Sequence, residues 1–291
     1  MKNRYLINAF ADEASDLLEG QTAALLRNRL DGIEIRNIGA KSISDHTAAE
    51  AKELKKQLDS AGIKARTVGS PIGKINIETD SFEEHTEKFR RTLEIASILG
   101  SEKIRLFSFF IPHGKNPGDY RNEVIDRLGK FLDIAKGSGI LLCHENEKGI
   151  YGDSAERCLD LYTALPGLHA IFDPANFIQC GQNTEKAWEL LKSRILYLHI
   201  KDALADGSVV PAGKGIGNVE KIVSEYVAAG GREFTIEPHL TVFSGLSGLE
   251  REGDTSVVGT IYRYPSRDAA FDAACGAFIK ILEKISKFLR R

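Results

Sequence analysis

The stretch GILLCHENEKGIYGD, residues 139–153, changes character at its middle. Residues 140–143 are apolar enough to form a buried strand, but the run HENE at 144–147 follows directly. Charged groups at the end of a buried strand cost free energy unless an ion or a polar group pairs with them. The sequence therefore predicts a partner for Glu145 or Glu147 at the point where this strand ends.

The composition of the 291-residue chain is that of an ordinary globular protein, with 42% hydrophobic and 27% charged residues. Lys+Arg number 39 and Asp+Glu 41, a formal net charge of -2, so the charge balance gives no reason to expect nucleic acid or an anionic membrane as a partner. The length suits one large α/β domain or two small ones. No Pro/Gly/Ser-rich linker divides the chain, and we expect residues 1–291 to form a single domain.

Cysteine usage and the N-terminus indicate a reduced, cytoplasmic protein. Cys143, Cys158, Cys180 and Cys275 are far apart and form no CxxC pair. The opening MKNRYLINAF leads into a predicted strand without an apolar run of signal-peptide length. No apolar run approaches the roughly 20 residues that span a bilayer.

Eight short runs rich in β-branched and aromatic residues recur along the chain, separated by amphipathic segments. The runs begin at Tyr5, Gly32, Ile63, Lys103, Gly139, Leu168, Arg194 and Glu233. Their spacing is that of a βα unit, and eight such units in one domain make a (β/α)8 TIM barrel. We therefore predict an α/β fold with a single closed barrel.

Local signals mark the predicted helices. The segments 48–62 and 85–100 have helical periodicity, and each ends at a glycine that suits a helix C-cap. Ser81 with Glu84, and Asp153 with Glu156, have the spacing of a capping box and predict two helix starts.

A long segment of about residues 240–266 follows the last predicted strand. Loops of this length are uncommon in compact domains unless they act as lids or form interfaces. We expect this segment to enclose a substrate or to contact another subunit, and a homo-oligomer is compatible with the sequence.

Metal-ligand residue types stand at the ends of the fifth to eighth predicted strands. They are Glu145 in CHENE, Asp173 in FDPAN, His199 in LHIKD and Glu237 in TIEPH. Singly, Asp173 suits a helix cap, His199 a hydrogen-bonded core histidine and Glu237 a surface charge. Their recurrence at the same point of four consecutive units favours one shared site, because the carboxyl ends of barrel strands meet at one face. Three carboxylates and one imidazole suit Mn²⁺, Mg²⁺, Co²⁺ or Zn²⁺.

The sequence resembles the xylose isomerase-like TIM barrels, also described as the sugar phosphate isomerase/epimerase or AP endonuclease family 2 superfamily. The motifs that carry the resemblance run from FADEAS at Phe10 through GIEIR, GSPIGK, HEN, FDPAN and LHIKD to IEPH. It implies that Glu145, Asp173, His199 and Glu237 bind one divalent metal ion. In the ketose 3-epimerase branch the two glutamates also exchange protons with substrate carbon, which implies a catalytic acid/base pair of Glu145 and Glu237.

The resemblance predicts a metal-dependent isomerase or epimerase of a small sugar or sugar phosphate that works through an enediolate. Ketose epimerases of this type carry a histidine where this chain has Asn176, and an amide cannot carry a proton. An inosose-type dehydratase on the same site is therefore an alternative. An AP endonuclease and a non-catalytic sugar-binding barrel are further alternatives, although no set of extra ligands for a three-metal cluster is evident before Glu145.

Four side chains are predicted to contact the carbohydrate substrate, namely Lys201, Asn176, His239 and Arg36. Lys201 and His239 each lie two residues beyond a predicted ligand, and Arg36 ends the second strand. A solvated strand-end lysine, and a charged pair of Arg36 with Glu34 inside the barrel, are the structural alternatives.

Two glycine-containing loops raise the question of a phosphate group. SPIGK at 70–74 and AGKGIGN at 212–218 follow predicted strands, where backbone amides can bind phosphate. Glycines in such loops also serve only to permit a turn, and both readings stay open.

Overall fold

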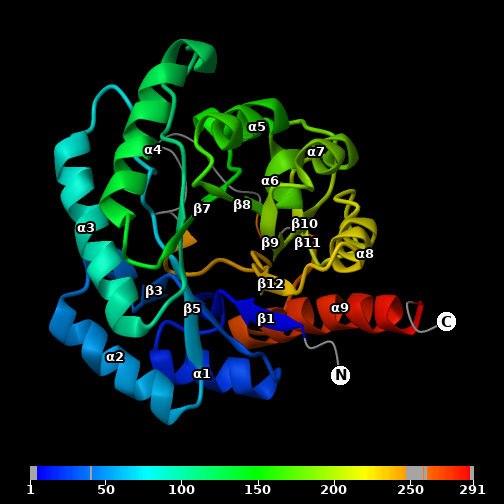
Figure 1. Ribbon diagram of the computed structural model, residues 1–291. Coiled ribbons are helices and arrows are strands. Elements are labelled where there is room, and N and C mark those ends of the chain that lie inside the picture. Colours follow the sequence, from blue (N-terminus) through cyan, green and yellow to red (C-terminus); the bar gives the residue numbers. More distant parts are fainter. Residues whose placement is uncertain (1–4, 40, 247–257, 259–260, 289–291) are drawn as a thin grey trace.

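Eight parallel strands close into a barrel in the computed structural model, which describes residues 5–39, 41–246, 258 and 261–288 (Figure 1). The strands, in their order around the barrel, are β1 (Leu6–Ala9), β12 (Glu233–Ile236), β9 (Ile195–Ile200), β8 (His169–Phe172), β7 (Leu141–Glu145), β6 (Lys103–Leu106), β5 (Lys64–Gly69) and β2 (Gly32–Ile35). Each predicted run contains one of these strands. The predicted single TIM barrel is confirmed.

Helices surround the barrel and connect its strands (Figure 1). They are α1 (Leu18–Arg27), α2 (Ala48–Ser60), α3 (Phe82–Leu99), α4 (Arg121–Ala135), α5 (Ala155–Ala164), α6 (Pro174–Gln179), α7 (Thr184–Leu191), α8 (Val219–Ala228) and α9 (Arg267–Phe288). Short 3-10 helices occur at η1 (Ala11–Glu13), η2 (Ile43–Asp45), η3 (Pro117–Tyr120) and η4 (Tyr151–Asp153). Two small antiparallel hairpins, β3 (Asn37–Ile38) with β4 (Lys41–Ser42) and β10 (Asp202–Ala203) with β11 (Val209–Val210), follow β2 and β9.

One of the two predicted helix starts is correct and the other is wrong. Ser81 is the N-cap of α3, and its hydroxyl accepts a hydrogen bond from the Glu84 amide at 3.2 Å. Helix α5 instead begins after Ser154, which accepts from the Arg157 amide at 3.3 Å. Asp153 lies in η4 and pairs with the Arg157 guanidinium, because the adjacent serine already satisfies the helix terminus.

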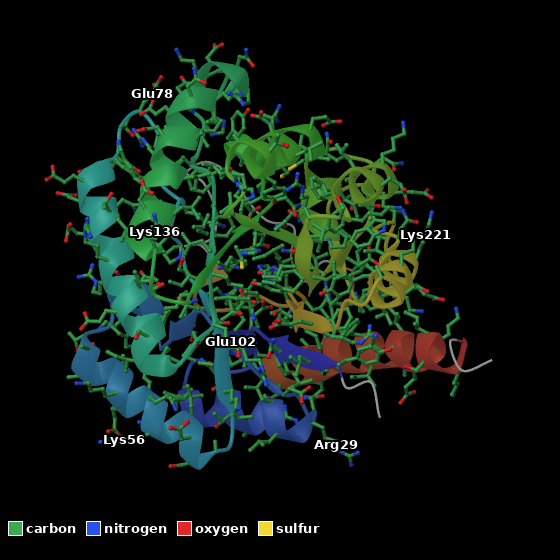
Figure 2. All side chains as sticks on the ribbon, in the orientation of Figure 1. Arg29, Lys56, Glu78, Glu102, Lys136 and Lys221 are labelled. Carbon is green, nitrogen blue, oxygen red and sulfur yellow. The ribbon has the colours of Figure 1, made fainter. Side chains whose placement is uncertain are left out.

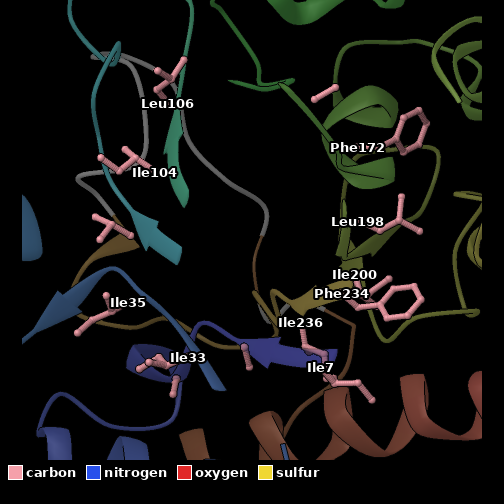
Figure 3. Packing of buried hydrophobic residues seen from close by; sticks show 14 of the residues in the cluster. Ile7, Ile33, Ile35, Ile104, Leu106, Phe172, Leu198, Ile200, Phe234 and Ile236 are labelled. Carbon is pink, nitrogen blue, oxygen red and sulfur yellow. The ribbon is translucent and has the colours of Figure 1, made fainter. Parts of the chain in front are cut away.

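Alternate residues along each barrel strand face the helices or the barrel axis. The outward layer packs against the helices and includes Ile7, Ile33, Ile35, Ile104, Leu106, Phe172, Leu198, Ile200, Phe234 and Ile236 (Figure 3). Cys143, Ile171 and Tyr197 have the opposite parity and form a separate buried cluster. These three precede the predicted ligands Glu145, Asp173 and His199 by two residues, so the ligands share their inward face.

The outer surface of the helices is charged. Lys56 on α2, Lys221 on α8 and Arg29 just beyond α1 project away from the barrel (Figure 2), and Lys136 just beyond α4 is exposed. Within the described residues, none of the helices combines the length and the apolar character that crossing a bilayer requires.

The described start of the long segment after β12 packs over the barrel mouth. Leu240 and Phe243 are buried, and the Ser244 hydroxyl donates to Asp16 at 2.8 Å. Residues 247–257 and 259–260 of the predicted 240–266 segment lie outside the described residues. Its expected function as a lid or interface stays a prediction.

Candidate functional site

All four predicted metal ligands lie together at the carboxyl end of the barrel strands. Glu145 ends β7 and His199 lies in β9, whereas Asp173 and Glu237 directly follow β8 and β12. All four side chains are buried, and one ligand atom from each lies within 4.8 Å of those from the other three. The structure thus brings together the residues that the sequence selected, and metal binding by them stays a prediction.

Asp173 is both the N-cap of a helix and a predicted metal ligand. Pro174 begins α6, and Asp173 caps that helix by accepting a hydrogen bond from the Asn176 amide on Oδ1 at 2.9 Å. Its Oδ2 is buried, accepts no hydrogen bond from the part of the chain that the structure describes, and lies 3.0 Å from Lys201 Nζ. The helix cap therefore orients the carboxylate and leaves its second oxygen for a cation.

His199 is held between the predicted ligands and the barrel interior. Its Nδ1 lies 2.9 Å from Glu145 Oε1 and 3.6 Å from Glu237 Oε2. Its Nε2 lies 3.4 Å from Glu34 Oε2. A metal-binding histidine usually directs its second ring nitrogen at a carboxylate, and Glu34 is placed to fill that position. In the sequence, Glu34 alternates with Ile33 and Ile35 in GIEIR, and this alternation indicated that its side chain faces the barrel interior.

Three cationic side chains contact the ligand carboxylates. Lys201 Nζ lies 2.8 Å from Glu237 Oε2, and Arg36 donates to Glu237 Oε1 at 3.1 Å. Arg105, on β6, donates to Glu145 Oε2 at 3.1 Å and was missed in the sequence. Its position on the inward face of KIRLFSFF was the available signal.

The donor set fits a divalent ion. Asp173 Oδ2 is without a hydrogen bond within the described residues, and the Lys201 ammonium lies between Asp173 and Glu237, so a cation is already favoured there. An ion held by Glu145, Asp173, His199 and Glu237 would replace that ammonium. Three oxygens and one imidazole nitrogen suit an ion of hard to borderline character.

The protonation states of the three carboxylates follow from burial and charge. Burial acts to raise the pKa of Glu145, but His199 and Arg105 outweigh it and lower that pKa to about 2. For Glu237 burial is likewise outweighed, chiefly by Lys201, and the pKa falls well below its ordinary value. Burial raises the pKa of Asp173 to about 7, although Lys201 opposes the change. Glu145 and Glu237 are thus ionised at neutral pH.

The predicted substrate-binding residues all lie beside these ligands. Asn176 donates through Nδ2 to Glu145 Oε1 at 3.2 Å, and His239 Nδ1 lies 3.7 Å from Glu237 Oε1. Lys201 and Arg36 contact Glu237 directly, as described above. Substrate contact by these four side chains stays a prediction.

Glu147, the second acid of the opening stretch, has a partner of its own. Its Oε2 lies 3.0 Å from Lys74 Nζ, a buried ammonium that also stacks on the Phe107 ring at 4.4 Å. Burial lowers the pKa of Lys74, and Glu147 counteracts this only in part. Glu145 and Glu147 therefore have different environments although they are two residues apart.

The two glycine-containing loops use their amides within the protein. Gly213, Gly215 and Gly217 donate their N–H groups to the Asp202 carboxylate at 2.9, 3.0 and 2.9 Å. In the other loop, Gly73 donates its N–H to His85 Nε2 at 2.7 Å. These amides are engaged, so the reading of the glycines as turn formers describes both loops better than a phosphate cradle.

Comparison with known proteins agrees with this geometry. The family described as "Xylose isomerase-like TIM barrel" matches residues 25–240, a span that includes all four predicted ligands. The chain belongs to this family. The resemblance seen in the sequence motifs is thereby confirmed. No curated protein matches the chain in sequence.

Several solved structures have the same fold as this chain, and their names describe different proteins. A D-tagatose 3-epimerase-like protein shares 17% identity at a TM-score of 0.72, covering 97% of this chain and 99% of that chain. The IolI protein with a binding zinc atom shares 14% identity at a TM-score of 0.74, covering 96% and 98%. The probable 3-DHS dehydratase AsbF from Bacillus anthracis shares 16% identity at a TM-score of 0.68, covering 95% and 98%. At these identities the likeness concerns the fold.

Proposed function

We propose that this barrel is a divalent-metal-dependent isomerase or epimerase of a small sugar, working through an enediolate intermediate. The observation that carries the proposal is the convergence of Glu145, Asp173, His199 and Glu237 at the carboxyl end of the barrel. A protein of similar fold is described with a binding zinc atom, which supports a divalent ion in this barrel. When bound, such an ion supplies Lewis-acid polarisation of the substrate carbonyl.

The chain's own residues supply the proton transfers. Glu145 and Glu237 are ionised at neutral pH, which is the state a general base needs before it removes a proton. They come from β7 and the end of β12, so they approach the site from different sides of the barrel. One glutamate would remove the proton next to the carbonyl, and the other would return a proton on the opposite face.

Polar neighbours would orient the sugar. The Lys201 ammonium can donate to a substrate carbonyl or hydroxyl, and Asn176 can donate to a hydroxyl but cannot carry a proton. Because the glycine amides of both candidate loops are engaged, we propose that the substrate is not phosphorylated. Cytoplasmic localisation and assembly into a homo-oligomer remain proposals from the sequence.

A dehydratase is the second candidate function. The Lys201 ammonium lies 3.0 Å from Asp173 and 2.8 Å from Glu237, and once a bound ion had displaced it from these carboxylates it would be the acid that protonates a departing hydroxide. One of the proteins of similar fold is named as a probable dehydratase. Only dehydration changes the mass of the product, so mass spectrometry of the product separates the two reactions.

The test of the proposed function screens metal-loaded protein against ketoses, aldoses and inososes in deuterated water. We expect turnover with deuterium entering the product at the carbon next to the carbonyl. In Glu145→Gln and Glu237→Gln the turnover rate should fall at least about 100-fold, as is typical for the loss of a general acid–base group. Glutamine keeps the size and one oxygen ligand but cannot carry a proton.

The matched control is Glu147→Gln, because Glu147 lies two residues from Glu145 but pairs with Lys74 instead of the ligands. Parent-like turnover by a metal-loaded Gln variant of Glu145 or Glu237 would show that this glutamate is only a ligand. Metal binding without turnover on any substrate of these classes would support a non-catalytic barrel.

A further inference from the structure

A second group of ligand-type side chains adjoins the first. Glu13 in η1, Glu237 and His239 are buried, and one ligand atom of each lies within 4.8 Å of those of the other two. Glu237 belongs to both groups and presents Oε2 to His199 and Oε1 to His239. The barrel mouth therefore has two adjacent places where anionic oxygens and an imidazole face one another.

His239 is held in an unusual backbone conformation. Its φ is 44°, a region that non-glycine residues rarely adopt, and its amide donates to Glu13 Oε2. The ring is buried, and its Nδ1 has no hydrogen-bond partner among the described residues, although it lies 3.1 Å from Glu13 Oε1 and 3.7 Å from Glu237 Oε1. A buried nitrogen directed at two carboxylate oxygens marks a position suited to a cation.

Arg36 supplies a cation at this position. It donates to Glu237 Oε1 and to Glu13 Oε1, each at 3.1 Å. Two further bonds to Asp12, at 2.9 and 3.0 Å, hold the guanidinium in a fork geometry. Its carbon also lies 4.4 Å from the Phe10 ring centre and 4.7 Å from that of Phe243. The guanidinium is fixed and contacts the same oxygens that a second ion would bind.

We propose that Glu13, Glu237 and His239 form a second cation site of this barrel and that the Arg36 guanidinium is its resident cation. Arg36 holds Glu237 Oε1 and leaves Oε2 to the predicted metal site. It also restricts the barrel to one divalent ion. The inference rests on the proposed function only in taking the neighbouring site as the metal site.

This arrangement bears on the class of reaction. Hydrolysis at multi-metal sites relies on ions that share ligands and together stabilise the attacking and leaving oxygens. Here a shared ligand, Glu237, is present, but an immobile arginine occupies the second position. Arg36 thus favours single-ion sugar chemistry over phosphodiester hydrolysis, and its removal should create the second metal site.

The test titrates metal-free protein with Mn²⁺ and measures the number of bound ions by calorimetry and elemental analysis. We expect one ion for the parent, two for Arg36→Ala and Arg36→Gln, and one for Arg36→Lys, whose ammonium keeps a positive charge there. Two Mn²⁺ ions bridged by Glu237 should also be magnetically coupled, which electron paramagnetic resonance detects. Two neutral variants are used so that misfolding of one leaves the other informative.

Three controls separate this site from its neighbour. Arg105→Ala removes the arginine that bonds Glu145, and it should bind one ion, because among the described residues Glu145 belongs to one ligand group only. The double variant Arg36→Ala/His239→Ala should bind one ion, at the predicted metal site. The double variant Arg36→Ala/Asp173→Ala should also bind one ion, at the second site.

Folded Arg36→Ala and Arg36→Gln that still bind one ion, or a parent that binds two, would overturn the proposal. A parent that binds none, with an Arg36→Ala ion that is lost on adding His239→Ala, would refute the neighbouring metal site and support this one.

Discussion

Glu34 shows how one buried carboxylate can determine the chemistry of a histidine. Its Oε1 accepts from the Tyr197 hydroxyl at 3.2 Å, and its Oε2 accepts from the Thr235 hydroxyl at 2.8 Å. The same Oε2 lies 3.4 Å from His199 Nε2. A proton on Nε2 leaves Nδ1 free to bind a metal ion, and Nδ1 is the nitrogen that faces Glu145.

Replacing Glu34 with Gln should therefore weaken metal binding without removing a ligand. We expect a loss of about 10- to 100-fold in affinity, the range typical of partners that orient a metal-binding histidine. Calorimetric titration of metal-free protein measures it. The control is Glu233→Gln, a barrel-strand carboxylate that pairs with Lys103 instead, and it should bind as the parent does. Parent-like affinity in Glu34→Gln would rule out the orienting function.

The ligands were predictable from the sequence, but their surroundings were only partly so. Glu145 and Glu237 are recognisable because strand ends repeat at regular intervals and their carboxylates need partners. Arg105 gave only its position on the inward face of its run as a signal, and this is weak because an arginine within an apolar run also suits the outside of a barrel. Its hydrogen bond to Glu145 depends on strand register, which the chain specifies only once the barrel has closed.

At the scale of elements, the conformation of the loop after β5 and its attachment to α3 depend on one glycine and one neutral histidine. Gly73 has φ +88°, and a Cβ there would lie 2.0 Å from the Phe107 carbonyl oxygen. Its amide donates to His85 Nε2 on α3, so that nitrogen must be unprotonated. Burial, with a smaller contribution from Lys88, lowers the pKa of His85 to about 4. The loop that carries Lys74 is thus tied to α3 by a bond that acid breaks.

This bond predicts a specific acid sensitivity. Between the ordinary histidine pKa of about 6.5 and the folded value of about 4, the unfolded chain binds a proton that the folded protein does not. The free energy of unfolding should therefore fall by about 3 kcal/mol from pH 7 to pH 4 on account of His85 alone. His85→Gln keeps an acceptor for the Gly73 amide but does not titrate, so its free energy of unfolding should fall by about 3 kcal/mol less than that of the parent over this pH range. Urea unfolding of both proteins at pH 7 and pH 4 measures the difference. An equal decline in parent and variant would contradict the assignment.

Helix boundaries were less predictable than helices. The spacing of Asp153 and Glu156 resembles a capping box, yet Ser154 caps α5. A complete capping box occurs instead at Thr47 and Glu50, where each side chain bonds the other's backbone amide. Adjacent polar residues compete for one helix terminus, and the approach of the preceding loop decides between them.

At the scale of the whole molecule, one face of each barrel strand contributes to stability and the other face contributes to the candidate site. Residues of one parity pack against the helices, and those of the other parity line the interior below the predicted ligands. The fold was predictable because strand-helix units recur with this pattern along the chain. The centre of the site was predictable because the barrel brings its strand ends together. The charge network around it was only partly predictable, because contacts such as that of Arg36 with Glu237 cross the barrel between strands far apart in sequence.

Neighbouring residues of β12 allow this separation to be measured. Phe234 is buried against the rings of Tyr226 and Phe278, at 5.5 and 5.1 Å between ring centres, whereas Thr235 faces inward and bonds Glu34. Phe234→Ala should lower the free energy of unfolding by about 3–5 kcal/mol and leave the metal affinity of the folded protein unchanged. Thr235→Val should lower it by only about 1–2 kcal/mol but weaken metal binding about 10-fold, because Glu34 loses a donor that fixes it below His199. Urea unfolding and metal titration of both variants test this. If Phe234→Ala weakened metal binding as much as Thr235→Val, or if Thr235→Val left metal affinity unchanged, stability and metal binding would not divide between the two faces of the strand.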